Sequence, residues 1–384
     1  MKTPGNNIGD EAALKGIIYG LRERIECNID VTYSKNVDLK TVSSFIDHEF
    51  HDESFWFGKI KFIGFLLGIL IGISKKNSVY ESFKKADAII IAPGGAGMSK
   101  FNLKSLYKNY LFSKVCKIKN KNIMYYGCGM GPFESKDKKL VKKLISSVDM
   151  VTCRDEDSIK LLEKLSPELI EKVYLTSDSA LQYRNNRSIK SIPEKIIIAM
   201  TPIDLSFFFG EKAVTYNNII VESYATLINW LFRCNRLSKV KFMVHVDSYN
   251  EKKIVNQIID YFDEGIQFEK CFPNGYENAI EEYKMCDVCV GARHHAAIFS
   301  IKAGTPAICV AYEHKAIGFM RQCNLSEYVI DVCNLNPGKL LSLLHNLIIN
   351  YEEIEKTIYE QMDLIEENSR KNTDFFLKMI KYVE

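Results

Sequence analysis

The sequence of 384 residues lacks the patterns that mark several specialised classes of protein. Lysine and arginine number 51 against 48 acidic residues, so the net charge is only +3 and no nucleic-acid partner is indicated. The N-terminal region has no basic segment followed by an apolar run, so no signal peptide is predicted. The eleven cysteines form no compact disulfide spacing, which favours free thiols in a reducing, cytoplasmic setting.

The apolar run at 60–73, interrupted only by Lys61, falls short of the about 20 residues that a membrane-spanning helix needs. Aromatic residues and lysines flank the run, as they do in segments that lie at a membrane interface. We favour a buried helix or a hydrophobic cap. The interfacial alternative stays open as, at most, a weak peripheral contact with the inner face of a membrane.

Two glycine-rich loops, 93–97 and 127–131, lack the full dinucleotide fingerprint and the lysine of a phosphate-binding loop. Binding of NAD or ATP is therefore not expected. Both loops end apolar runs, 86–95 and 122–132, that are typical of buried parallel strands. Further strands are expected at 149–158 and 172–180, with a helix at 138–147. This alternation predicts a doubly wound α/β sheet with its functional loops along one edge.

A polar stretch at 184–195 interrupts the alternation, and a second series of strands and helices starts at Lys195. Strands are expected at 195–202, 240–247, 285–295 and 305–312, and helices at 217–237, 252–262 and 296–303. We predict a Rossmann-like domain over 1–185, a second one over 193–335 and a helical tail over 336–384. Two such domains facing each other across a cleft, with C-terminal helices, is the layout of GT-B-type enzymes.

The segment Asn7–Glu11, Asn-Ile-Gly-Asp-Glu, opens an apolar-periodic stretch and is typical of a loop that runs into a helix. Asn7 or Asp10 is expected to cap that helix. In an α/β protein such a loop follows the first parallel strand and lies at the ligand-binding edge of the sheet. Here that strand would precede Met1, so we expect either a clipped chain or a sheet without its usual first strand.

A basic cluster ends the segment 285–295, which we expect to be a strand running into a loop; Gly291 allows the backbone to turn there, toward a helix that begins near Arg293. The first turn of a helix attracts anions, and a guanidinium there binds carboxylate or phosphate through two parallel hydrogen bonds. A neighbouring histidine can move a proton near neutral pH. Treating the segment as extended, we expect His295 to share the side of Arg293 and His294 to turn away. A purely structural basic corner is the alternative.

Cys286 and Cys289, taken with His294 and His295, match a weak zinc-binding spacing. Residues three apart on a strand point to opposite faces, so we expect two buried thiols and no metal. Two more cations follow strands: Arg154, for which capping by Asp155 is the alternative interpretation of the segment, and Lys315.

These motifs occur in a specific order along 7–319: Asn-x-Gly-Asp-Glu, Gly-Gly-x-Gly, Gly-x-Gly-x-Gly-Pro, Arg-Asp-Glu-x-Ser, a strand ending in Asp178, Gly-x-Arg-x-His and Tyr-x-x-Lys. In this order the chain resembles the polysaccharide pyruvyl transferases. The resemblance implies a GT-B-like fold and transfer of the pyruvyl group of phosphoenolpyruvate (PEP) to hydroxyls of a cell-surface polysaccharide or its precursor, giving a pyruvate ketal. It implies no cofactor and no metal.

The resemblance also implies roles for individual residues. His295, Arg293 and Asp10 would be catalytic, and Arg154 and Lys315 would join Arg293 and His295 in binding PEP. The side of the site toward the glycan or lipid-linked sugar acceptor would be lined by Asn7, Glu11, Gly95 and Gly129. Two alternatives stay open: a GT-B glycosyltransferase that uses a nucleotide sugar, and a non-catalytic relative that binds sugar.

Overall fold

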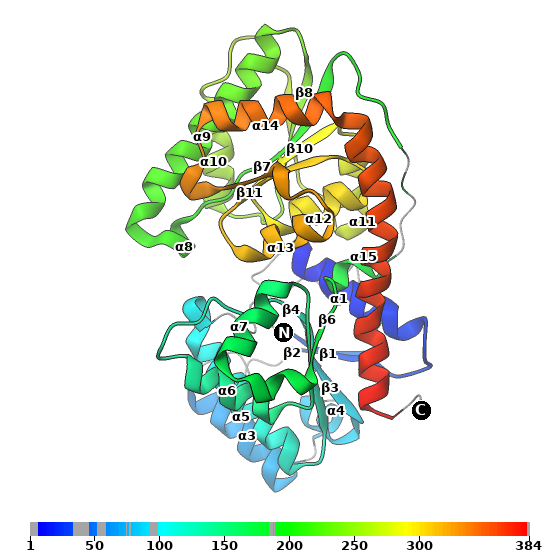
Figure 1. Cartoon of the computed structure of the whole chain (residues 1–384). Coiled ribbons are helices and arrows are strands. Elements are labelled where there is room, and N and C mark those ends of the chain that lie inside the picture. The colour runs from blue at the N-terminus through cyan, green and yellow to red at the C-terminus, as the bar shows by residue number, and fades with distance from the viewer. Residues whose placement is uncertain are drawn as a thin grey trace. The chain divides into compact units, whose positions relative to one another are not determined.

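The computed structural model describes residues 7–33, 46–51, 59–73, 75–76, 78–92, 99–183, 187 and 189–381. The chain forms two units, which Figure 1 draws with their element labels. Unit 1 comprises 1–183 together with 366–384, and unit 2 comprises 184–365. The long helix α15 (Tyr351–Met379) contributes residues to both.

Unit 1 is built on a parallel sheet with the strand order β3-β4-β5-β6. A separate pair of parallel strands joins β1 to β2. Its strands are β1 (Asp30–Tyr33), β2 (His48–His51), β3 (Ala88–Ile91), β4 (Asn122–Cys128), β5 (Met150–Cys153) and β6 (Val173–Leu175). Its helices are α1 (Ile8–Arg22), α3 (Lys59–Ile71), α4 (Val79–Lys85), α5 (Ser99–Ile118), α6 (Lys138–Ser147) and α7 (Glu156–Leu165), with short turns η2 (Pro167–Lys172) and η3 (Ser179–Leu181).

The four-stranded sheet carries an apolar core on each face. On one face, residues of α3, α5, α6 and α7 form a single cluster with β4 and β5, for example Phe65, Val115 and Leu144. On the other face, Ile17 of α1 and Phe376 of α15 pack against β4. The strand β4 is buried on both sides because the helices cover it completely, as its nearly continuous apolar sequence predicts.

Unit 2 contains a six-stranded parallel sheet with the order β12-β11-β10-β7-β8-β9. Its strands are β7 (Ile196–Thr201), β8 (Leu237–Met243), β9 (Phe268–Cys271), β10 (Val288–Gly291), β11 (Ala307–Ala311) and β12 (Val329–Asp331). Its helices are α8 (Ser206–Phe209), α9 (Ala213–Arg233), α10 (Tyr249–Ile259), α11 (Tyr276–Lys284), α12 (His294–Lys302), α13 (His314–Gln322) and α14 (Pro337–Ile349), with turns η4 (Gly210–Lys212), η5 (Ser326–Tyr328) and η6 (Val332–Asn334).

The strand order of unit 2 reverses direction at β7. From β7 the chain adds β8 and β9 on one side, and then returns to place β10, β11 and β12 on the other. Helices flanking such a reversal diverge, which leaves a crevice outside the carboxyl ends of the two central strands. A ligand site is therefore expected at the loops that follow β7, β8 and β10.

The apolar run at 60–73 forms α3, a helix whose two sides differ. Phe62, Phe65 and Ile69 are buried in the core of unit 1, whereas Leu67 and Ile71 are 53% and 75% exposed. The expected burial is thus found on one face only. None of the helices that the structure describes is long and apolar enough to cross a membrane.

Candidate functional site

Polar side chains gather where the central strands of unit 2 end. Thr201 is the last residue of β7, His245 lies two residues beyond β8, and Arg293 lies two residues beyond β10. Because β8, β7 and β10 are adjacent and parallel, these three positions share one edge of the sheet. Arg293 was predicted from sequence, and His245 was not.

Arg293 occupies the N-cap position of α12, and its guanidinium forms a two-pronged ion pair with Glu251. The distances are 2.5 Å from Nη2 to Oε1 and 3.3 Å from Nε to Oε2. Glu251 belongs to the first turn of α10, which Ser248 caps through the Glu251 backbone N–H. In the sequence, Ser248-x-x-Glu251 is a capping-box pattern. That local pattern predicts the start of a helix, but it does not predict that Glu251 pairs with Arg293.

His245 is buried beside this ion pair. One ring nitrogen, Nε2, is 2.9 Å from the Tyr283 hydroxyl, which in turn lies 3.0 Å from the hydroxyl of Thr201. Burial and the positive charge of Arg293 lower the pKa of His245 to about 3, so the ring is neutral at physiological pH. Its Nδ1 atom is buried without a hydrogen-bond partner among the residues that the structure describes.

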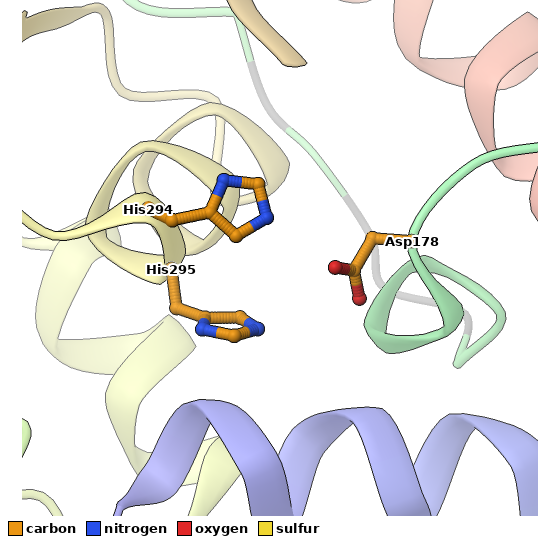
Figure 2. A group of neighbouring side chains, drawn as sticks. All are labelled: Asp178, His294 and His295. Carbon is orange, nitrogen blue, oxygen red and sulfur yellow. The ribbon is translucent and has the colours of Figure 1, made fainter. Parts of the chain in front are cut away.

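His294 and His295 both belong to the first turn of α12, and Figure 2 shows the two rings projecting from that turn. Their centroids are 5.0 Å apart. The centroid of the His295 ring lies 5.8 Å from that of Phe299, and the Phe299 centroid lies 5.3 Å from that of His245. The centroid of the His294 ring lies 6.2 Å from that of Phe319 in α13. The expected strand-like alternation does not hold, because the helix already begins at His294.

Lys315 lies in the first turn of α13, directly after β11, and its side chain is 5% exposed. Its Nζ atom lies 4.0 Å from a carboxylate oxygen of Glu313. Unit 2 therefore places three residues predicted from sequence, Arg293, His295 and Lys315, at the starts of two neighbouring helices, α12 and α13. It adds His245 and Glu251 to them.

In unit 1, Asn7 rather than Asp10 caps α1. The Oδ1 atom of Asn7 accepts the Gly9 backbone N–H at 3.1 Å, and its Nδ2 atom donates to the Asp10 carboxylate at 3.1 Å. Asp10 is 7% exposed, and Glu11 is half-buried next to it. The alternatives of a clipped chain and of a sheet without its usual first strand concern a region before Asn7, outside the described residues.

Arg154 follows β5 and forms a buried ion pair with Asp178, which follows β6. Burial alone would lower the pKa of Arg154, but the charges of Asp178 and Asp155 outweigh it and raise that pKa. Asp178, also drawn in Figure 2, accepts the Ala180 backbone N–H at 3.0 Å as the cap of η3. Asp155 caps α7 through the Ser158 N–H at 2.7 Å, as the capping interpretation expected.

The glycine-rich loop after β4 uses its backbone donors within the protein. Gly127 donates its N–H to the Thr152 hydroxyl, and Met130 donates to the Ser158 hydroxyl, each at 2.7 Å. Gly129 lies between these two and is buried. Gly95, the glycine predicted in the preceding loop, lies outside the described residues.

Cys286 and Cys289, the two cysteines of the weak zinc pattern, are both completely buried. Burial raises the pKa of Cys286 to about 12 and raises that of Cys289 as well. A thiol with such a pKa stays protonated at neutral pH. Cys286 instead donates to the backbone oxygen of Glu282.

Comparison with known proteins identifies the lineage of this chain. A family model described as polysaccharide pyruvyl transferase matches residues 7–314. The chain belongs to this family. The match begins at Asn7 and includes Arg293 and His295, and it ends one residue before Lys315. The family relationship inferred from the order of the motifs is therefore confirmed, and the chain is placed among transferases of polysaccharide biosynthesis.

Individual relatives agree with this assignment. The chain is 26% identical over 297 residues to the amylovoran biosynthesis protein AmsJ of Erwinia amylovora, covering 72% of this chain and 69% of AmsJ. Among solved structures, it resembles the UDP-GlcNAc 2-epimerase of Neisseria meningitidis bound to UDP-GlcNAc, with a TM-score of 0.61, 10% identity and 98% of each chain covered. It also resembles HepE of Anabaena in complex with UDP, with a TM-score of 0.61, 11% identity, and 100% of this chain and 98% of that chain covered. At such low identity the two structures bear on fold alone, and they confirm a GT-B-like α/β fold.

Proposed function

We propose that this member of the polysaccharide pyruvyl transferase family moves the pyruvyl group of PEP onto two hydroxyls of a sugar and closes a pyruvate ketal. The observation that carries the proposal is the group of Arg293, His295 and Lys315 at the carboxyl edge of the unit 2 sheet. Two helix N-termini and two cations at one edge suit a ligand that carries both a carboxylate and a phosphate.

The proposed reaction starts with protonation of PEP at C3, which leaves an oxocarbenium-like C2. One sugar hydroxyl loses its proton and forms a bond to C2. The bond between C2 and the phosphate oxygen then breaks, inorganic phosphate leaves, and the second hydroxyl forms the second bond to C2 as it loses its proton. The products are the ketal and inorganic phosphate, and the sequence of steps requires no oxidant or reductant.

Each residue of unit 2 has a defined part in this scheme. Arg293 binds a PEP oxyanion through its planar fork, and Lys315 supplies a second cation. His295 transfers the proton, because histidine is the side chain most often used as a general acid or base near neutral pH. His245 is unsuited to that task, since its pKa of about 3 keeps it neutral; we assign it to holding the edge of the sheet through Tyr283.

Roles in unit 1 belong to the same proposal. Arg154 contacts a PEP anion. Its guanidinium must then either bind Asp178 and the anion at once or release Asp178 for the anion. Asp10 deprotonates the acceptor hydroxyl. Its carboxylate is held by the Asn7 amide, which fixes its orientation. Asn7, Glu11, Gly95 and Gly129 line the acceptor side.

The test combines a product assay with a ligand-binding assay on the full chain. Release of phosphate from PEP should depend on an added acceptor, drawn from a panel of glycans and lipid-linked sugars, and NMR of the product should show a ketal carbon. Millimolar PEP should raise the melting temperature, because a ligand that binds the native state stabilises it. Stabilisation by UDP or a UDP-sugar, with none by PEP, would instead favour the nucleotide-sugar glycosyltransferase.

A further inference from the structure

Three helices of unit 1 carry an excess of positive charge, and none of their lysines has a part in the proposed transfer reaction. The helices α3, α5 and α6 contain two, five and four lysines respectively, and none of the three contains an aspartate or glutamate. The whole chain has a net charge of only +3. Such local excess is unfavourable for an isolated protein, because like charges repel, so it calls for an external anionic partner.

The three helices form one continuous layer. They share a single apolar core on one face of the four-stranded sheet, and α5 packs against both α3 and α6. Two contacts connect α3 to α5 and its end: the ammonium of Lys108 lies 5.2 Å from the ring centroid of Phe62, and Lys119, one residue beyond α5, donates to the Leu70 backbone carbonyl at 2.9 Å. The outward sides of the three helices therefore belong to one surface. Figure 1 shows them side by side in unit 1.

The outer side of α3 is apolar. Ile63, Leu67 and Ile71 are 49%, 53% and 75% exposed, and their spacing of four residues aligns them in one stripe along the helix. The helix has 13 residues and is too short to span a bilayer. Exposed Lys61, Lys75 and Lys76 flank the stripe. An apolar stripe with basic borders is the pattern of a helix that lies in a membrane interface.

In the same layer of helices, α5 and α6 line an open basic hollow of about 390 Å³. Tyr110, two serines and five lysines line it, namely Lys114, Lys117, Lys139, Lys142, Lys143, Ser146 and Ser147. Lys142 is paired with Glu168 at 2.6 Å. Among the residues that the structure describes, no ion pair neutralises Lys114, Lys139 or Lys143.

We propose that this surface, formed by the outer sides of α3, α5 and α6, docks the protein on an anionic lipid bilayer. The stripe of Ile63, Leu67 and Ile71 would enter the headgroup region, and the lysines of the hollow would bind lipid phosphates. A second copy of the chain fits poorly, because two such surfaces would bring many lysines together without a single acid from these helices. A nucleic acid would leave the apolar stripe uncovered. An anionic bilayer satisfies both halves of the surface, and the inference is independent of the donor and acceptor proposed above.

Flotation of the full chain with vesicles tests this docking. Vesicles of phosphatidylcholine alone are compared with vesicles that contain phosphatidylglycerol. We expect flotation with the anionic vesicles only. The triple substitution Lys114→Gln, Lys139→Gln, Lys143→Gln should lower the partition coefficient roughly 10- to 100-fold, because each lysine near an anionic surface contributes separately. The corresponding arginine variants should bind as the native chain does.

The apolar half is tested by Leu67→Ser with Ile71→Ser, which should reduce binding several-fold and make the remainder sensitive to salt. The matched control replaces three exposed lysines of unit 2, Lys212, Lys253 and Lys356, by glutamine and should bind normally. Equal flotation with neutral vesicles, no flotation with either kind, or full binding by the triple variant would overturn the proposal. Light scattering adds a further check: a native dimer that the stripe variant converts to a monomer, with vesicle binding unchanged, would assign the stripe to a second copy.

Discussion

The guanidinium of Arg293 holds the carboxylate of Glu251 in a two-pronged ion pair, with Nη2 2.5 Å from Oε1. The side chains are 17% and 8% exposed, so the pair is largely removed from water. An anionic ligand that approaches Arg293 must either share the guanidinium with Glu251 or displace it. The affinity for PEP is therefore expected to depend on both residues of the pair.

Arg293→Lys should impair turnover nearly as badly as Arg293→Ala. Lysine keeps the charge but loses the planar fork that binds two oxygens at once. Loss of a charge-assisted contact in a desolvated site costs about 2–4 kcal/mol in transition-state binding. Initial rates of phosphate release from PEP measure the effect. Full turnover by the lysine variant would show that charge alone is needed at this position.

Glu251→Gln should strengthen PEP binding, because it removes the carboxylate that competes for Arg293. We expect a fall in the dissociation constant of roughly 3- to 10-fold, for a charge contribution of about 1 kcal/mol. Thermal-shift titration with PEP measures it. Glu281→Gln, at an exposed ion pair with Lys284, serves as the matched control and should leave the affinity unchanged. Weaker binding by Glu251→Gln would mean that Glu251 orients Arg293 and does not compete.

His295→Ala should abolish turnover while the chain stays folded, with a loss of about 10²- to 10⁴-fold, the usual size for a general acid–base group. His295→Gln should retain PEP binding better than activity. His294→Ala should be milder and should change affinity or stability more than rate, although both rings project from the same turn of α12. Initial rates and circular dichroism of the variants distinguish the two. An inactive His294→Ala beside an active His295→Ala would reverse the assigned roles.

Much of the fold could be predicted from the sequence because buried parallel strands are short apolar runs that end in glycine or an acid. The helix at 138–147 was predicted with the bounds that α6 has, and the runs at 195–202 and 305–312 contain β7 and β11. The strands β9 and β12 were missed, as were β1 and β2. β9 and β12 are at the edges of their sheet; in β9 exposed residues alternate with half-buried ones, and β12 has only three residues, so neither has a long apolar run.

The candidate site could be predicted only in part. Arg293, His295 and Lys315 stand at strand ends, where the sequence itself indicates a functional loop. Glu251 and His245 could not be placed, because their proximity to Arg293 depends on the order of strands in the sheet, which is not written in any local pattern. The relation of His294 to His295 was mispredicted because α12 begins at His294, two residues before the helix expected at 296–303.

Gly16→Ala should destabilise unit 1. A Cβ atom at this position of α1 would stand 1.7 Å from the backbone oxygen of Ser179, so α1 and η3 must move apart. Overpacking against backbone costs about 1–3 kcal/mol or more in the free energy of unfolding. The matched control is Gly64→Ala in α3, where a Cβ meets nothing within 4 Å; there alanine should stabilise by about 0.5–1 kcal/mol through helix propensity. Urea denaturation of both variants measures the difference, and equal effects would show that α1 does not pack against η3 this closely.

Glu355→Gln should stabilise the protein above neutral pH and have little effect near pH 5. Glu355 is buried in α15, and its Oε2 atom accepts the Lys190 backbone N–H at 3.4 Å. The ammonium of Lys190 is occupied elsewhere, by the carbonyls of Lys284 and Cys286 and the hydroxyl of Thr305.

Burial raises the pKa of the Glu355 carboxyl from 4.5 to about 7, so between these two values the folded state holds a proton that the unfolded state has lost. The free energy of unfolding therefore decreases as pH rises through this window, and it stays lower above it. Glutamine never ionises and avoids that cost, which we expect to be roughly 1–3 kcal/mol at pH 8.5. Other groups, including Asp287 and Tyr351 nearby, are the same in both proteins and cancel in the difference.

Chemical denaturation at pH 5 and pH 8.5 measures the difference in the free energy of unfolding between the variant and the native protein. The control is Glu360→Gln, because Glu360 is 58% exposed and paired to Lys356. A difference that is the same at both pH values would mean that Glu355 ionises as readily in the folded chain as in the unfolded one.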